Sequence, residues 1–331
     1  MKRQALMILF SLALLLCLCL LFSPTPMKSF SSFVLGPFES LYFLGNLLNS
    51  ATPLLIGSLG MCISLQGGSF NLGGEGQIYL GGFLCAILSI GLSSLGAFGA
   101  VLAVLISILA AAIVAGLSGL FKSLWKTSEL ISSYLISNAL ILIVNYLVTG
   151  PFQDPSTNLF STQKIPQAFR LSKILLPSDL SSALLIALAL CLLSWLLLYK
   201  TKQGYEFRLY GSNPRFCQYG GISPSFCQIA PMVISGGFYG LAGSLSVLGT
   251  YYSCVKEFSS QMGFNALAIA LIARKHPILA LPASLFFAWL SSGSRIAMQR
   301  TDVTVEMALI VQAAVFLLVT CTFAFKRKKS L

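Results

Sequence analysis

The chain has 331 residues, of which 56% are hydrophobic and 9% are charged. A typical soluble domain carries roughly 25% charged residues, so this composition excludes a water-soluble globule and indicates a polytopic membrane protein. The net charge of +12 does not indicate nucleic-acid binding, because basic residues gather at the ends of apolar segments and at 326–329. We therefore expect contact with membrane lipid and no nucleic-acid partner.

Apolar segments of the length needed to cross a bilayer, about 20 residues, recur along the chain and predict an all-α fold of about ten transmembrane helices, with eight to ten as the range. The first follows Lys2 and Arg3 and precedes no small-x-small cleavage pattern, so we expect a retained helix, with a cleaved segment as the alternative. The eighth is too short to span alone, which predicts a half-helix, a re-entrant piece or an extension by polar neighbours. The segments lie at 6–22, 41–65, 76–91, 97–121, 130–149, 180–199, 228–252, 264–273, 277–293 and 305–325.

The distribution of basic residues predicts the orientation. In a ten-span scheme Lys and Arg are more frequent in the segments assigned to the cytoplasm than in those assigned outside, which places both termini in the cytoplasm. Residues 150–179, interrupted by prolines, are expected to form an external loop, and 200–227 a cytoplasmic loop. Residues 326–331 would form a basic cytoplasmic tail, so we expect one transmembrane domain over 1–331.

The most informative stretch is 70–77, which reads Phe-Asn-Leu-Gly-Gly-Glu-Gly-Gln between two apolar segments. Polar groups at membrane depth persist where they face protein or a water-filled path, and irregular backbone there is typical of a translocation route. We expect Phe70, Asn71, Glu75 and Gln77 to belong to a solute pathway. Glu75 could line the path, or act as a buried structural or gating carboxylate satisfied by freed backbone amides.

Other polar residues in the spans extend this pathway prediction. Asn138 and Asn145 are seven apart and share a helical face, which suits either a pathway or interhelical hydrogen bonds. Phe264 and Asn265 repeat the Phe-Asn pair of 70–71 after a glycine and five spans later. An odd number of spans reverses the orientation, so this echo is what an inverted repeat would give.

A short capped helix is predicted inside the cytoplasmic loop. Asn213 is a good N-cap, Pro214 suits the first helical position, and Gly220 and Gly221 would end the helix that includes Arg215. An isolated cytoplasmic helix of this kind is what a separate ATPase motor pushes on, and the alternative is a helix lying on the lipid surface. The chain has no Gly-x-x-x-x-Gly-Lys-Ser/Thr segment, so ATP would be bound by a partner subunit.

Four ordered motifs resemble those of bacterial ABC-transporter permeases of the simple-sugar and nucleoside type, which are related to branched-chain amino acid permeases. Residues 70–77 resemble that family's Phe-Asn-Ile-Gly-Ala-Glu-Gly-Gln motif, and 211–222 its Gly-x-Asn-Pro coupling segment. Residues 129–151 and 263–277 resemble its fifth-helix region and its late Gly-Phe stretch. Departures are Cys217, Ala273 and Lys275, where the family usually has Ala, Gly and Asn, and Ser137, where the family has Asn.

The resemblance implies an ABC importer permease fold and several partners: cytoplasmic ATPase subunits, a second permease copy or paralogue, and an extracytoplasmic solute-binding protein. It implies a bacterial cytoplasmic (inner) membrane location and import of a small polar solute. A nucleoside is favoured, with riboflavin or a simple sugar as alternatives. Such a subunit makes and breaks no bond, so we expect no enzymatic activity, catalytic residue, metal or cofactor.

Two rival classes fit the residues less well. An intramembrane serine protease at 116–119 would need a histidine base, and the lone His276 lies in a distant charged turn. An ion-driven secondary transporter commonly carries paired carboxylates in its spans, whereas Glu75 stands nearly alone. The capped cytoplasmic helix discriminates, because a motor-driven permease needs it and the rivals do not.

Overall fold

The computed structural model describes residues 25–301 and, outside that range, residues 13, 304, 310 and 313. In this described part the regular elements are helices, accompanied by two isolated β-bridges. The chain divides into two compact units, one built from residues up to 51, 175–178 and residues from 285 on, the other from 52–174 and 179–284. Each unit is considered by itself.

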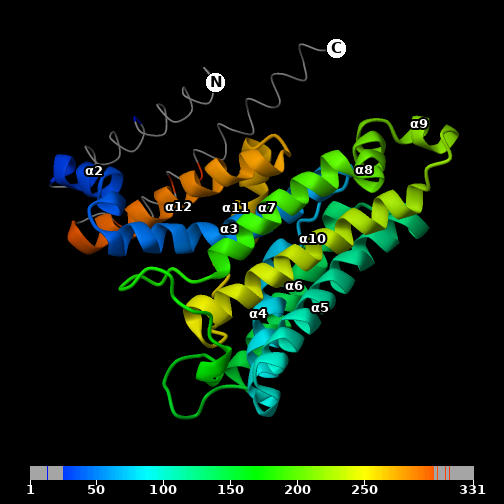
Figure 1. Ribbon diagram of the computed structural model, residues 1–331. Helices are drawn as coiled ribbons and strands as arrows, with labels where there is room; N and C mark the ends of the chain where they lie inside the picture. Colours follow the sequence, from blue (N-terminus) through cyan, green and yellow to red (C-terminus); the bar gives the residue numbers. More distant parts are fainter. Residues whose placement is uncertain (1–12, 14–24, 302–303, 305–309, 311–312, 314–331) are drawn as a thin grey trace. The chain divides into compact units, whose positions relative to one another are not determined.

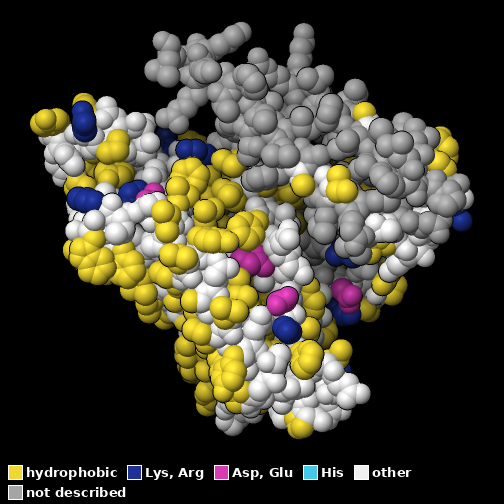
Figure 2. Space-filling view, turned by 180° about the vertical axis from the view of Figure 1, so that it is seen from behind, with side chains coloured by type: hydrophobic (Ala, Val, Ile, Leu, Met, Phe, Trp, Pro, Cys, Tyr) yellow, Lys and Arg dark blue, Asp and Glu magenta, His cyan; other side chains and the backbone are white. Residues whose placement is uncertain are grey.

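The apolar segments expected between residues 41 and 293 all correspond to helices. Two of these are short or weakly apolar: α4 (Gly74–Gly91), and α11 (Met262–Ile272), which at 1.5 Å per residue covers roughly half of a bilayer core. The expected segments at 6–22 and 305–325 and the tail at 326–331 lie outside the described residues. Figure 2 shows hydrophobic side chains over broad areas of one face, as a lipid-embedded protein requires. The helices long and apolar enough to cross a membrane are α3 (Leu41–Gln66), α5 (Gly96–Trp125), α6 (Glu129–Thr149), α7 (Ala183–Lys200), α10 (Pro224–Ser246, continued by η4, Val247–Tyr251) and α12 (Pro277–Arg300).

Small residues hold the larger unit together around α10. Helices α5 and α10 run side by side (Figure 1), and a Cβ added at Gly236 would lie 2.5 Å from the Ala111 carbonyl oxygen of α5. On the α4 side, a Cβ at Gly81 would lie 2.5 Å from the Gly240 carbonyl. Glycine and alanine at membrane-helix interfaces let backbones approach closely and gain dispersion contacts. Helix α10 therefore packs between α4 and α5.

The smaller unit contains a helix that the apolar pattern did not predict, α2 (Pro26–Val34). Its Phe33 is buried and meets Trp289 of α12 edge to face, with ring centroids 6.4 Å apart. Trp289 Nε1 donates to the Val34 carbonyl at 3.0 Å, and Glu39 forms an ion pair with Arg300. Helix α2 is shorter than a membrane span, so a search for spans could not find it.

The loop at 200–227 corrects one expectation. The helix predicted after Asn213 exists as α9 (Pro214–Tyr219), but it is not isolated. A second helix, α8 (Lys202–Ser212), precedes it, and the buried Cys217 of α9 packs with Phe207 and Tyr210 of α8. The sequence of α8 is only weakly apolar, so it does not predict a buried helix. Its two aromatic residues, Phe207 and Tyr210, are buried because α9 packs against them. The segment 150–179 is a loop with one short 3₁₀ turn, η3 (Gln167–Phe169), as its prolines predict.

Candidate translocation site and coupling segment

The glycine-rich motif contains a break between two helices. Helix α3 ends at Gln66 and α4 begins at Gly74, so residues 67–73 leave the helical path. Serine hydroxyls of α6 accept from amides at this break: Ser133 Oγ from the Leu72 N–H at 3.1 Å, and Ser137 Oγ from the Gly76 N–H at 2.8 Å. Buried amides without partners are costly, so Ser133 stabilises the irregular backbone of the break and Ser137 the first turn of α4.

Asn71 and Gln77 form a closed amide pair that spans the break. Asn71 Nδ2 donates to Gln77 Oε1 at 2.8 Å, and Gln77 Nε2 donates back to Asn71 Oδ1 at 3.1 Å. Asn71 also donates to Ser235 Oγ of α10 and accepts from the Gly73 N–H. Both amide side chains are 1% exposed. Their geometry fixes the backbone of the break, and any influence on a solute would act through that backbone.

Glu75 joins the break to the short helix α11. Its Oε1 accepts from the Gln261 N–H at 2.9 Å and its Oε2 from the Gly263 N–H at 2.8 Å. These are amides of the first turn of α11, where the helix dipole favours a negative charge. A Cβ at Gly263 would lie 2.6 Å from the Gly74 carbonyl carbon, so glycine is what allows the two helix starts to meet. The carboxylate thus has the partners expected of the structural or gating alternative.

A second polar group lies on the same side of α4. Tyr79 Oη donates to Asn145 Oδ1 at 2.8 Å, Asn145 Nδ2 donates to Glu257 Oε1 at 3.0 Å, and the Glu257 N–H donates to Tyr79 Oη at 3.1 Å. Three residues from three parts of the chain therefore close a ring of hydrogen bonds. Asn145 is half-buried and Glu257 is exposed. Of these three, the sequence had singled out only Asn145.

The other pathway residues are more dispersed. Asn138 is exposed on α6 and donates to the Tyr134 carbonyl one turn earlier, while its neighbour Ser137 faces the break. Phe264 is 42% exposed in the first turn of α11, and Asn265 follows it half-buried. The half-buried Phe70 lies in the break itself, so the two Phe-Asn pairs occupy different places relative to their helices.

The coupling segment has the caps that its residues predict. Asn213 Oδ1 accepts from the Phe216 N–H at 3.1 Å, and Pro214 begins α9. At the other end Gly221 has φ +73°, and the amides of Gly221 and Ile222 donate back into α9 at 3.3 and 3.0 Å. This pattern is a Schellman termination, which favours glycine. Arg215 is exposed.

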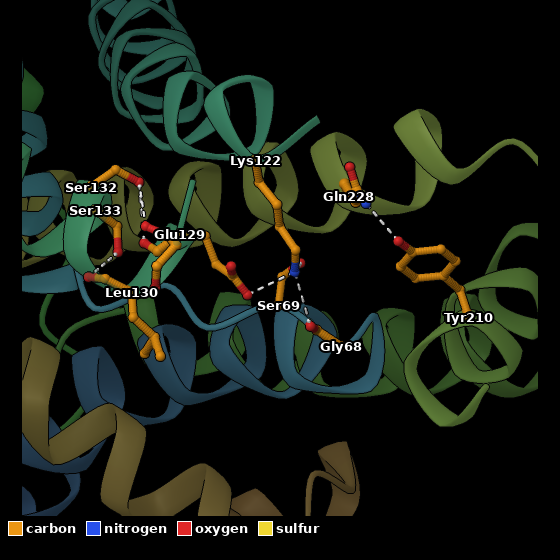
Figure 3. A network of polar contacts seen from close by, with 10 residues as sticks. Gly68, Ser69, Lys122, Glu129, Leu130, Ser132, Ser133, Tyr210 and Gln228 are labelled. Atoms are coloured by element: carbon orange, nitrogen blue, oxygen red, sulfur yellow. Dashed lines mark hydrogen bonds and ion pairs between the residues drawn. The ribbon is translucent and has the colours of Figure 1, made fainter. Parts of the chain in front are cut away.

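Helix α8 connects this segment to the helix break. A Cβ added at Gly211 would lie 2.8 Å from the Gly68 backbone nitrogen, and it would overlap the Gln66 carbonyl oxygen. The end of α8 therefore lies directly against the residues that lead into the motif at 70–77. Nearby, Gln228 Nε2 of α10 donates to Tyr210 Oη of α8 at 2.6 Å (Figure 3).

Two lysines hold the same stretch of backbone. Lys122 donates to the Gly68 carbonyl at 3.3 Å and pairs with Glu129, at the start of α6, at 2.7 Å (Figure 3). Lys275 donates to the Leu65 carbonyl at 3.1 Å, where a cation complements a helix C-terminus. Burial lowers the pKa of Lys275 from its ordinary value. Residues of α5, of α8 and of the turn after α11 therefore all contact the backbone at 65–68, where α3 ends.

Several of these residues carried no usable signal in the sequence. Gly211 was part of the recognised coupling motif, but its contact with Gly68 needs the fold. Tyr79 is one aromatic residue in an apolar helix, and Glu257 lies in a loop outside the apolar segments. Ser133 and Ser137, spaced one helical turn apart in an apolar helix, were the detectable hint.

Helices that stop and restart inside an apolar bundle, with their freed amides bonded to neighbouring helices, are typical of membrane transport proteins. The family model described as "Branched-chain amino acid transport system / permease component" matches residues 43–320. The chain belongs to this family of ABC-transporter permeases. It is therefore a multi-pass membrane transport subunit and not an enzyme.

Curated relatives with named solutes support this membership. The chain is 34% identical over 336 residues to the probable riboflavin import permease protein RfuC of Treponema pallidum, covering 98% of this chain and 87% of the relative. It is 27% identical to the glucose ABC transporter permease protein TsgB13 of Haloferax volcanii, over 91% of this chain and 82% of the relative. It is 25% identical to the guanosine ABC transporter permease protein NupP of Bacillus subtilis, over 88% and 84%.

Proposed function

We propose that this chain is the permease subunit of an ATP-driven importer in a bacterial cytoplasmic membrane, with both termini in the cytoplasm. Its partners would be ATPase subunits at the α8–α9 end, a second permease copy or paralogue, and an extracytoplasmic solute-binding protein. The observation that carries the proposal is the contact of Gly211 with Gly68, because it joins α8, on which the capped helix α9 packs, to the helix break.

The mechanism follows that contact. Closure of the ATPase subunits would push α9 through Asn213, Pro214 and Arg215, with Gly220 and Gly221 defining where the helix ends. Because Cys217 packs on α8, α9 and α8 would move together. Their displacement would shift the backbone at 66–69 and, through it, the start of α4.

The change would then reach the solute path at the Glu75 contact. Moving the start of α4 strains the two hydrogen bonds between Glu75 and α11, so α11 would be released on one side of the cycle. Alternating access of this kind needs an element with two discrete arrangements, and a half-helix capped by another helix is one. The pathway residues proposed to line or shape the route are Phe70, Asn71, Glu75, Gln77, Asn138, Asn145, Phe264 and Asn265.

Riboflavin is our first candidate for the solute, because the riboflavin relative matches at 34% identity over nearly the whole chain. A nucleoside, which the motif at 70–77 favours, is the second candidate, since a guanosine relative matches at 25%. Both solutes combine a heteroaromatic ring with neighbouring hydroxyl groups. Glucose, for which a third relative is named, also has neighbouring hydroxyl groups but no heteroaromatic ring.

The test is solute-stimulated ATPase activity of the chain reconstituted with its ATPase and binding protein. Riboflavin, guanosine and glucose are compared in the wild type and in Asn213→Ala, which removes the cap of α9. Ser212→Ala serves as the control, since it changes an adjacent exposed hydroxyl. The proposal is supported if one solute stimulates ATP hydrolysis by the wild type and by Ser212→Ala but not by Asn213→Ala. It is contradicted if the solute stimulates Asn213→Ala as strongly as the wild type.

A further inference from the structure

The ring formed by Tyr79, Asn145 and Glu257 leaves one acceptor unused. Glu257 Oε1 accepts from Asn145 at 3.0 Å, whereas Oε2 has no hydrogen-bond partner among the described residues. The Glu257 side chain is exposed, and the Tyr79 hydroxyl holds its backbone amide at 3.1 Å. The structure therefore presents an exposed carboxylate that is held through one oxygen and has its other oxygen without a partner among the described residues.

Glu257 is one of four residues between 252 and 261 with left-handed backbone, the others being Tyr252, Ser260 and Gln261. Glu257 has φ +56°, a left-handed conformation that a non-glycine residue rarely adopts. Strain of this kind persists where the surroundings enforce it, and it gathers at ligand sites. Here the hydrogen bond from the Glu257 amide to Tyr79 Oη and the bond from Asn145 supply the enforcement.

Neighbouring contacts place the carboxylate beneath the expected external loop. The Lys256 N–H donates to the Phe160 carbonyl at 2.8 Å, and the Thr162 N–H donates to the Cys254 carbonyl at 3.0 Å. Asn145 lies in the last turns of α6, just before that loop begins. The ring thus lies between the expected external loop and the first turn of α4, which carries Glu75.

We propose that Glu257, oriented by Asn145 and Tyr79, binds two neighbouring hydroxyl groups of the transported solute. The inference rests on the proposed function and names the chemistry that the permease recognises. An ionised carboxylate only accepts hydrogen bonds and has about two acceptor sites on each oxygen. Oε2 can therefore accept from one hydroxyl, and the site of Oε1 that Asn145 leaves open can accept from its neighbour. A charged acceptor makes a stronger bond than a neutral one, so the carboxylate outperforms an amide at this place.

One chemistry then covers solutes that otherwise differ. The relatives are named for riboflavin, glucose and guanosine. Riboflavin has a ribityl chain, guanosine a ribose and glucose a pyranose ring, and all three carry adjacent hydroxyls. A site for the flavin or purine ring could not serve glucose, whereas a site for a diol serves every one of them.

The first experiment detects weak binding directly. Saturation-transfer NMR on the complete transporter in nanodiscs, without the binding protein, is recorded with riboflavin and guanosine for the wild type and Glu257→Gln. The glutamine keeps an oxygen for Asn145 and preserves the ring. We expect saturation of the ribityl or ribose protons in the wild type and at least a threefold loss in Glu257→Gln. Absence of that signal in the wild type, or equal signals in both proteins, overturns the inference.

The second experiment separates recognition from folding. Uptake of riboflavin, guanosine and glucose into proteoliposomes is compared for the wild type, Glu257→Gln and a control variant. The control is Asp179→Asn, which neutralises another carboxylate of the loop region, paired with Lys173. Uptake by Glu257→Gln should fall about tenfold, the loss expected for a charged hydrogen bond, and the control should stay within twofold of the wild type. Wild-type uptake that Glu257→Gln leaves unchanged overturns the inference and leaves the proposed function intact. Absence of ATP-dependent uptake of any diol-bearing solute by the wild type overturns both.

Discussion

The Glu75 carboxylate accepts from the Gly263 backbone amide at 2.8 Å, although 188 positions separate the two residues in sequence. The other oxygen of the same carboxylate accepts from the Gln261 amide, so the contact is bidentate. The start of α4 and the start of α11 are thus held together by one side chain. This contact gives the account its most direct set of mutational tests.

Replacing Glu75 should release α11. Glu75→Ala removes both acceptors and leaves two amides of the first turn of α11 without partners, which costs about 1–3 kcal/mol each. Glu75→Gln keeps one acceptor and should give an intermediate effect. The measurement is the rate of amide hydrogen exchange at residues 261–264. We expect the slowest exchange in the wild type, faster exchange in Glu75→Gln and the fastest in Glu75→Ala. Equal protection in all three proteins would show that the carboxylate does not hold α11.

Adding a methyl group at Gly263 should separate the same two helices. The new Cβ would lie 2.6 Å from the Gly74 carbonyl carbon and 2.8 Å from Glu75 Cα, both backbone atoms that cannot rotate away. We expect Gly263→Ala to lose solute uptake and to lower the melting temperature. Gly91→Ala is the matched control, because a Cβ added at this helix end would have no atom within 4 Å. Its effect on the melting temperature should be neutral or slightly stabilising. Similar behaviour of both variants would contradict close packing at Gly263.

The contact between Gly211 and Gly68 should be needed for coupling. Gly211→Ala would push α8 away from the backbone at 66–69, so ATP hydrolysis should continue while solute uptake falls at least tenfold. The measurement is the ratio of solute transported to ATP hydrolysed in proteoliposomes. Ser212→Ala, one position along the same helix, should keep the wild-type ratio. An unchanged ratio in Gly211→Ala would rule out this route for the signal.

The amide pair at the break should behave as a unit. Asn71→Ala leaves Gln77 with buried donors and acceptors unsatisfied, at a cost of about 1–3 kcal/mol. Once one partner is gone, removing the second should cost much less, so a double-mutant cycle with Gln77→Ala should give a coupling of about 1 kcal/mol or more. Thermal unfolding in detergent measures each variant. Additive losses would mean that the two amides act independently.

Local chemistry explains why much of the fold was predictable. Asn213 and Pro214 determine how α9 begins and Gly221 how it ends, because capping depends on residues a few positions apart. Apolar runs determine the spans in the same way. The break at 67–73 was expected from the glycines and polar residues around Glu75.

Contacts between distant segments explain what could not be predicted. Choosing between Ser137 and Asn138 requires knowing which face of α6 meets α4, and the structure turns Ser137 inward and leaves Asn138 exposed. Glu257 gains its partners from two helices far away in sequence. Helix α8 is marginal alone and becomes defined when α9 covers Phe207.

The energy source of uptake distinguishes an ATP-driven permease from an ion-driven transporter. Riboflavin uptake is measured in proteoliposomes that contain the chain and its binding protein, with or without the ATPase subunits, and with ATP or an imposed proton or sodium gradient. We predict uptake only when the ATPase subunits and ATP are both present, and loss of that uptake in Gly211→Ala. Uptake that proceeds without the ATPase subunits, or that follows an ion gradient, would contradict the account.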